Sequence, residues 1–291
     1  MPTMAPRYTR ATTLEWAAGI DAGPFSSISC GERITFRNVE MMVTLSAAAA
    51  LTERVRVFVN LVVAPMHAPT LVAKELATLD VLCDGRLTVG VGVGGREHDY
   101  RAVGSTFERR HPRLDAAVGE IRSVWSGNPP FGGSDPVGPS PVQDRIEVLA
   151  GAMGPKGLGR AARWADGVSG FALTADGAEM VEAAEAARHA WSLAGRDAPP
   201  RLVTGCFYVL GVDEPQATLQ QFTYDYLEIF GSGVARTLAD DAPVWNQERL
   251  VRVLDDAATA GADEFILVPG TVDPACLRAT ADVVGTWLAA H

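Results

Sequence analysis

Cysteine is scarce in this chain of 291 residues, and it is never clustered. The four cysteines are Cys30, Cys83, Cys206 and Cys276. They form no C-x-x-C pair, and no two histidines stand near them at the spacing of metal ligands. We therefore expect free thiols in a reducing compartment and no metal site.

Long apolar runs and an excess of positive charge are also missing. No stretch approaches the roughly 18 apolar residues that span a bilayer, and the first twenty residues contain no apolar signal core. Lys and Arg total 25 against 35 Asp and Glu, a formal net charge of −10 at pH 7. This charge opposes binding to nucleic acid or to an anionic membrane. We expect a cytoplasmic protein whose partner is a small molecule.

Two periodicities alternate along the whole chain. Short β-branched segments that end in Gly or Pro predict strands at 25–30, 54–63, 86–94, 145–151, 166–173, 201–211 and 263–270. Helical patterns occupy 12–23, 69–85, 107–126, 155–165, 176–195, 213–230, 246–261 and 273–290. Nearly all-apolar strands that alternate with helices predict a parallel sheet covered by helices.

Seven strands are one fewer than a closed (β/α)8 barrel requires. The missing strand would precede the helix at 12–23, where only "MPTMAPRYTRA" remains. We predict a single α/β domain over 1–291, a TIM-type (β/α)8 barrel whose first strand is apparently truncated. Either the barrel begins with a stub, or Met1 is not the true start. The Pro- and Gly-rich segment 126–144 is expected to form a loop over one barrel mouth.

The strand at 86–94 is rich in glycine, and "GVGVGG" satisfies the letters of a dinucleotide fingerprint. That fingerprint needs a helix directly after its glycines, whereas "REHDYRAVGS" has no apolar stripe and predicts no helix before Phe107. Alternation places Gly90, Gly92 and Gly94 on one face and the valines on the other. If the valines meet the outer helices, the glycine face leaves a void that suits a large planar ligand. A bend or a close neighbouring chain explains the glycines equally well.

Four segments together resemble the bacterial luciferase-like oxidoreductases, which use flavin mononucleotide (FMN) or the deazaflavin coenzyme F420. They are "TERVRVFVNLVVAPMHAPTLVAK", "LATLDVLCDGRLTVGVGVGGREHDYRAVG", "RRHPRLDAAVGEIRSVWSG" and "VLAGAMGPKGLGRAARWADG". Cys83 stands where serine is usual in that family. The resemblance implies a (β/α)8 barrel with the cofactor at its C-terminal mouth.

The resemblance also implies which residues hold the cofactor. A bulge with a non-prolyl cis peptide is expected beneath the ring near Leu61 and Val62, next to Asn60. The glycine strand would contribute Gly92, Val93, Gly94 and Gly95. The turn before the helix at 155–165 would hold the phosphate through Ala152, Met153, Gly154, Lys156 and Gly157, because free N–H groups and a helix dipole attract anions. Glycine dihedrals in a plain turn explain this stretch as well. The Gly154-Pro155 step favours F420.

The sequence also contains candidate catalytic residues. Where many relatives carry an acid and a histidine, this chain has Glu32 and Arg33, so no histidine is carried over there. Arg33 could stabilise an anionic reduced deazaflavin or a substrate carboxylate, or simply pair with an acid. His98 follows the glycine strand and is our first choice as acid or base. His67 is expected to cap or pack, and His111, in an arginine cluster, to steer a phosphate or face solvent.

These observations predict an oxidoreductase that binds F420 and transfers hydride to or from an organic substrate. The alternatives are an FMN-dependent monooxygenase that uses O2, a flavin-binding protein without catalysis, and an unrelated barrel lyase or isomerase. The substrate pocket is expected from the loops 33–40, 96–106 and 126–144. A homodimer is expected through the helix in "EMMVTLSAAAALT", with Met42, Leu45 and Ala49 in the interface.

Overall fold

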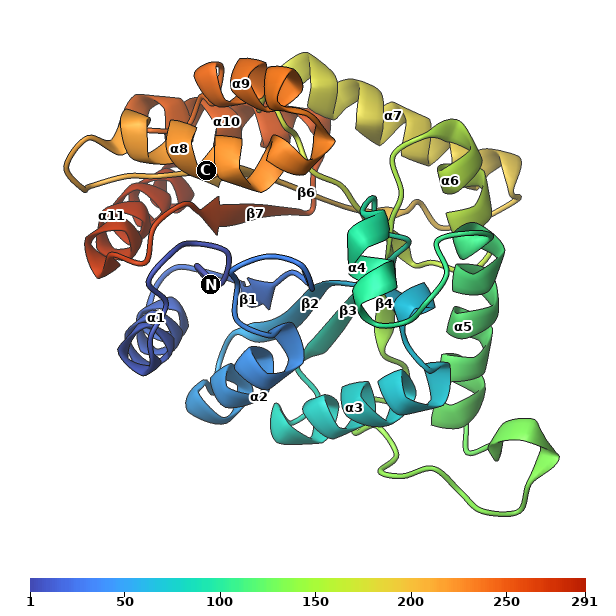
Figure 1. The fold of residues 1–291 in the computed structure, drawn as a ribbon. Helices are drawn as coiled ribbons and strands as arrows, with labels where there is room; N and C mark the ends of the chain where they lie inside the picture. Colours follow the sequence, from blue (N-terminus) through green and yellow to red (C-terminus); the bar gives the residue numbers. More distant parts are fainter.

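The computed structural model describes residues 1–291 and contains one parallel seven-stranded sheet wrapped by helices (Figure 1). The strands are β1 Ser27–Cys30, β2 Arg56–Val62, β3 Leu87–Gly92, β4 Glu147–Gly151, β5 Gly167–Ser169, β6 Arg201–Tyr208 and β7 Glu264–Pro269. Each strand pairs with the next in the chain, in the order β1-β2-β3-β4-β5-β6-β7. All seven strands predicted from the sequence are therefore confirmed.

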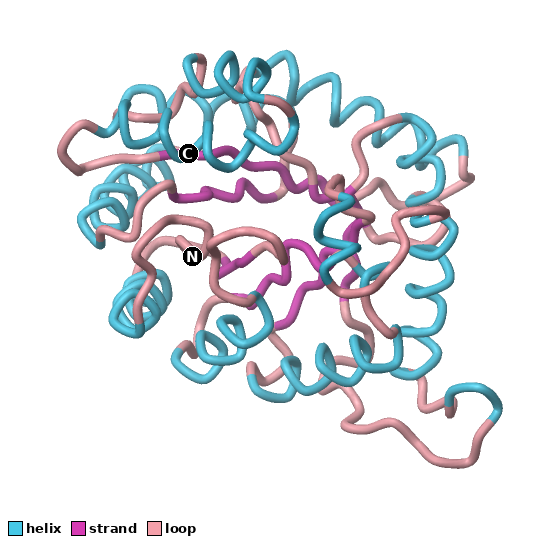
Figure 2. The backbone as a smooth tube through the Cα atoms, in the orientation of Figure 1, coloured by secondary structure: helices cyan, strands magenta, loops and turns pink.

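The helices lie outside the strands, as the cyan and magenta tubes of Figure 2 show. They are α1 Arg10–Ala22, α2 Met41–Leu51, α3 Pro69–Leu82, α4 Glu97–Ala102, α5 Arg110–Trp125, α6 Pro155–Ala161, α7 Gly177–Leu193, α8 Pro215–Leu227, α9 Ser232–Asp240, α10 Gln247–Ala260 and α11 Pro274–Ala290. Three 3-10 turns accompany them, η1 Ala64–Met66, η2 Pro130–Gly132 and η3 Glu228–Phe230. The nearly closed barrel is the predicted fold class.

The prediction that no helix precedes Phe107 was wrong, because α4 begins at Glu97. With six residues α4 makes fewer than two turns, which is too short to show an apolar stripe. Its place is fixed by Tyr100, a fully buried side chain whose hydroxyl donates to the Val93 carbonyl at 2.6 Å. The dinucleotide-fingerprint interpretation gains nothing from this helix, since the Gly94 and Gly95 backbone turns before α4 begins.

The barrel is open between β1 and β7, which do not pair with each other. A cavity of about 350 Å³ separates them and is lined by Ser26–Ser29, by residues 263–267 and by α1 and α11. The Met1 amino group donates to the Ser29 carbonyl at 3.0 Å, so the chain end lies against β1 (Figure 1). At the bottom of this seam Ser26 donates to Glu264 at 2.9 Å, and Arg201 pairs with both Glu264 and Glu147. Side chains thus link the two unpaired strands.

Segment 126–144 leads from α5 into β4, so it lies at the amino-terminal ends of the strands. Val142 N–H donates to Asp80 of α3 at 2.8 Å, and Lys74 donates to the Gly138 carbonyl at 2.7 Å. The expectation that this loop helps to build the substrate pocket was wrong. In an α/β barrel the connections that follow helices lie at the end opposite the βα loops.

The residues proposed for the dimer interface also need correction. Leu45 and Ala49 of α2 are buried against the strands, with 0% and 2% exposure, so they cannot meet a second copy. The exposed positions of α2 are Val43, Ala47, Ala50 and Leu51. The homodimer itself stays a prediction. The four cysteines are buried and unpaired, and none of the helices has the length and apolarity to cross a membrane.

Candidate active site

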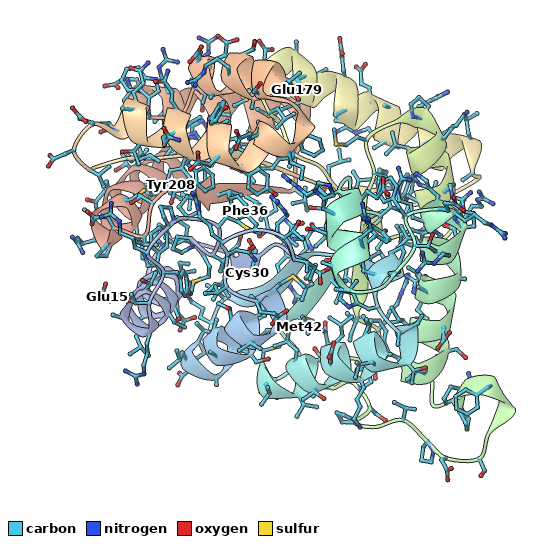
Figure 3. The ribbon with its side chains drawn as sticks, in the orientation of Figure 1. Glu15, Cys30, Phe36, Met42, Glu179 and Tyr208 are labelled. Atoms are coloured by element: carbon cyan, nitrogen blue, oxygen red, sulfur yellow. The ribbon has the colours of Figure 1, made fainter.

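The largest cavity of the barrel opens at the carboxyl ends of the strands and measures about 620 Å³. Cys30 of β1, Gly92 of β3, Gly151 of β4 and Phe207 of β6 all line it, so strands from around the barrel contribute. Figure 3 labels Cys30, the last residue of β1, and Phe36, which lies on the loop that follows β1. Both its place and its volume are typical of a small-molecule site in this architecture.

The floor of this cavity contains a bulge in β2. The pairing of β2 with β3 shifts register between Val59 and Val62, and the Asn60–Leu61 peptide is cis. The non-prolyl cis peptide was expected at this bulge, one residue further along. Asn60 and Leu61 line the cavity, whereas the third predicted residue, Val62, packs on the helix side of the sheet. Asn60 is held across the barrel by the Ser169 hydroxyl, which donates to its Oδ1 at 2.8 Å.

The glycine face of β3 makes room for this bulge. A Cβ atom on Gly92 would lie 2.9 Å from Leu61 Cδ1, and one on Gly90 would lie 2.9 Å from the Val59 carbonyl. Gly151 of β4 likewise faces the Leu61 side chain at a distance that excludes a Cβ. The opposite face, with Val89 and Val91, packs under the outer helices, as the alternation predicts. The glycines therefore admit the neighbouring strand and also border the open cavity.

A smaller cavity of about 230 Å³ opens beside the first and shares Gly31, Asn60, Leu61 and Gly94 with it. Glu32, which follows β1, lines it with a side chain that is 5% exposed. Its carboxylate accepts from Val63 N–H at 2.6 Å and lies 2.7 Å from His67 Nε2. The hydrogen bond with Glu32 raises the pKa of His67. A carboxylate–histidine pair therefore stands at the mouth, although no histidine follows β1.

Arg33 and Arg96 also line the smaller cavity, and both are 7% exposed. Arg33 Nε lies 3.5 Å from Asp99 Oδ2, and its guanidinium carbon lies 4.5 Å from the centre of the Phe36 ring. Burial, and next the charge of Arg33, lowers the pKa of Arg96 to about 10. Arg33 does not pair with Glu32. The sequence analysis did not single out Arg96, because it follows the glycine-rich strand directly and belongs to no recognisable motif.

The remaining predicted residues are distributed around the mouth. His98 is exposed on α4 and lines neither cavity, so its role as acid or base stays a prediction. Val93 and Met153 border the larger cavity, and Gly95 borders the smaller one. Ala152, Gly154, Lys156 and Gly157 lie in the turn before α6 and in its first residues, outside both cavities, and Lys156 is exposed.

The arginine cluster around His111 serves the structure rather than the mouth. His111 is exposed, and Arg113 donates to the Pro65 carbonyl and to Ser105 Oγ, which ties α5 to η1. Burial, and then the charges of Arg110 and Arg160, lowers the pKa of His111. This cluster does not face either cavity.

The segment from α8 to α9 covers the mouth, and sequence reasoning missed it. Tyr226, Phe230, Val234 and Leu238 line the larger cavity from this segment, and the first two also line the smaller one. The predicted helix at 213–230 contains the first two of these residues. Nothing in its periodicity indicates that its last turn, and the unpredicted α9, reach back over the barrel.

The chain is thus a parallel α/β barrel with a glycine-lined cavity over a cis bulge. The family model described as luciferase-like monooxygenase matches residues 2–285, and the chain belongs to that family. An uncharacterized protein of Mycobacterium tuberculosis is 33% identical over 175 residues, which are 57% of this chain and 61% of that relative.

Solved structures agree with the fold. An F420-dependent secondary alcohol dehydrogenase in complex with an F420-acetone adduct superposes with a TM-score of 0.78 at 16% identity, covering 95% of this chain and 93% of that one. The oxygenating constituent of 3,6-diketocamphane monooxygenase from Pseudomonas putida, in complex with FMN, superposes with a TM-score of 0.73 at 13% identity, covering 99% and 96%. At these identities the likeness concerns the fold.

Proposed function

We propose that this oxidoreductase binds coenzyme F420 in the larger cavity and transfers hydride between the coenzyme and an organic substrate. The observation that carries the proposal is the cavity itself, bordered by glycines of β3 and β4 over the Asn60–Leu61 bulge. A Cβ at Gly92 or at Gly151 would press on the Leu61 side chain, so a larger residue at either position would displace Leu61 into the space that a flat ring system needs.

When bound, the deazaflavin accepts or donates the hydride at its central carbon. Asn60 and Leu61 would support the ring from one side, and Phe230 and Val234 would close the cavity from the other and exclude water. Gly154, Lys156 and Gly157 would hold the phosphate end, because the first turn of α6 follows directly after the cavity residues Gly151 and Met153. The Gly154-Pro155 step is the feature that favours F420 over FMN.

The Glu32–His67 pair would accept or donate the proton that accompanies hydride transfer. Glu32 borders the smaller cavity, while His67 stands behind it and is half-buried, so a proton could pass between the site and solvent through this pair. His67 would act as a positioning residue for Glu32. The presence of this pair argues against a flavin-binding protein without catalysis.

An FMN-dependent monooxygenase is the second candidate, supported by the FMN complex among the structural neighbours. The two candidates differ in which cofactor they bind and in whether the reaction needs oxygen.

Anaerobic titration of the apoprotein with F420 and with FMN, followed by absorbance, tests the proposal. We expect saturable spectral changes with F420 and a much weaker response to FMN. Tight FMN binding without a response to F420 would favour the monooxygenase, and binding of neither would refute both.

A further inference from the structure

We infer that Arg33 and Arg96 form an anion-binding subsite in the smaller cavity, and that it takes a carboxylate or phosphate group of the substrate. The assignment to the substrate rests on the proposed function, whereas the anion site itself does not. The argument depends on which hydrogen-bond donors in this cavity are already used.

The Arg33 guanidinium is buried without enough partners. Its side chain is 5% exposed, and neither Nε nor Nη1 makes a hydrogen bond. Asp99 Oδ2 lies 3.5 Å from Nε and forms an ion pair with Arg33, but it accepts no hydrogen bond from Nε. A buried donor without a partner costs about 1–3 kcal/mol, and more when it is charged. An anion in the cavity would remove that cost.

The carboxylates at this cavity are already committed to other donors. Glu32 accepts from Val63 N–H at 2.6 Å and is hydrogen-bonded to His67 at 2.7 Å. Asp99 Oδ1 accepts from the Thr35 N–H at 2.7 Å and from the Thr35 hydroxyl. These bonds hold the two negative charges in the wall, while Nε and Nη1 of Arg33 remain without a hydrogen bond.

A second guanidinium strengthens the site. The guanidinium carbons of Arg33 and Arg96 each lie 5.1 Å from the centre of the Tyr226 ring, and both side chains line the same cavity. Arg96 donates a single hydrogen bond, from Nη2 to the Tyr226 carbonyl at 2.7 Å. Two like charges in a buried cavity repel each other, and an oxyanion between them is the arrangement that stabilises both.

The position of the subsite favours the substrate over the cofactor as the source of the anion. The smaller cavity meets the larger one beside Gly31, Asn60 and Leu61, where the reacting ring is proposed to lie. The turn proposed for the cofactor phosphate adjoins the larger cavity through Gly151 and Met153, which do not line the smaller cavity. A cavity of about 230 Å³ accommodates a compact oxyanion next to the reacting carbon.

Calorimetric titration of the apoprotein with inorganic phosphate and with acetate, at low ionic strength, tests the subsite. Arg33→Gln and Arg96→Gln should each weaken binding about tenfold or more, the loss expected for a charge-assisted hydrogen bond. Arg37→Gln is the matched control, because Arg37 lies on the same loop and pairs with Asp225 at 2.7 Å outside the cavity. It should bind like the parent. Equal affinity in all four proteins, or no binding to the parent, would overturn the subsite.

Two further measurements keep this test decisive. Arg33→Lys and Arg96→Lys keep the charge and should retain part of the affinity, and circular dichroism verifies that every variant is folded. If a Gln variant does not fold, phosphate binding to the parent protein is measured at increasing chloride concentration. Chloride should weaken the binding of phosphate, and binding that does not depend on salt would contradict an anion site.

The source of the anion is decided by repeating the phosphate titration on protein saturated with F420. Unchanged phosphate affinity supports the substrate as the source, whereas displacement of phosphate by F420 assigns the subsite to the cofactor and overturns the substrate assignment. If the arginine-dependent phosphate binding is found but neither cofactor binds, the proposed function fails and the anion subsite stands.

Discussion

The His67 imidazole and the Glu32 carboxylate lie 2.7 Å apart, although His67 follows β2 and Glu32 follows β1. The two strands are neighbours in the parallel sheet, so their carboxyl ends meet at the same edge. The fold therefore assembles this pair from residues that follow two different strands, and the pattern of a single strand does not reveal it. The charge on His67 should therefore influence the stability of the protein.

The stability of the protein should fall as the pH rises past the raised pKa of His67. Because the pKa is raised in the folded state, the contribution of the pair is complete below the ordinary value of 6.5 and is lost as the pH rises through the raised value. His67→Gln should lower the free energy of unfolding by about 1–3 kcal/mol at pH 6 and by less at pH 9. Denaturant unfolding at several pH values measures this difference in stability.

His98→Gln, at an exposed position, is the control. Parallel curves of stability against pH for the parent and for His67→Gln would contradict the prediction.

Gly92→Val should abolish or strongly weaken cofactor binding and leave the fold largely intact. Its Cβ would press on Leu61 Cδ1, and Leu61 would yield toward the cavities that it lines. We expect at least a tenfold loss of F420 affinity, about 1.4 kcal/mol, with an unfolding midpoint near that of the parent. Gly119→Val is the control, since a Cβ there meets nothing within 4 Å. Parent-like affinity in Gly92→Val would show that the cofactor lies elsewhere.

Glu264→Ala should destabilise the barrel. Glu264 of β7 accepts from Ser26 and Ser27 beside β1 and pairs with Arg201 of β6, so one carboxylate joins both sides of the open seam. Its removal also leaves Arg201 with one carboxylate fewer. We expect a loss of about 1–3 kcal/mol in the free energy of unfolding. Glu185→Ala, exposed on α7, should leave the stability unchanged; an equal effect of the two substitutions would refute a role for the seam.

Lys156→Ala should weaken cofactor binding and make it less sensitive to salt than in the parent. Lys156 is exposed at the start of α6, so its attraction to a phosphate is screened as the ionic strength rises. Titrations with F420 at low and at high salt measure the effect. An unchanged dissociation constant at low salt would remove Lys156 from the site.

The strands were predictable because each is short, apolar and ended by Gly or Pro. The alternation of valine and glycine in β3 separated the two faces of the strand, and the structure places the valine face under the helices. The long helices followed from their apolar periodicity. By contrast α4 is too short to show a period, and its buried residues Asp99 and Tyr100 fix it.

The parts of the site that escaped prediction depend on contacts between distant segments. Arg96 became recognisable only when folding placed it beside Arg33 and Tyr226, which are 63 and 130 residues away in the chain. The cover formed by Tyr226 and Phe230 has the same cause. Conversely, segment 126–144 looked like a functional loop by composition, whereas its position after a helix places it at the far end of the barrel.

Because β1 and β7 do not pair, no backbone hydrogen bonds of the sheet hold these two strands at a fixed separation. A closed ring of strands keeps a fixed circumference because every strand is paired on both sides, whereas here β1 and β7 each keep one free edge. Ser29 and Cys30 on one edge, and residues 266–268 on the other, both border the larger cavity. The side-chain links at the seam therefore join the two strand edges that no backbone hydrogen bond joins. We expect that a substitution that breaks these links at the amino-terminal ends of the strands lets the two edges of the cavity move relative to each other.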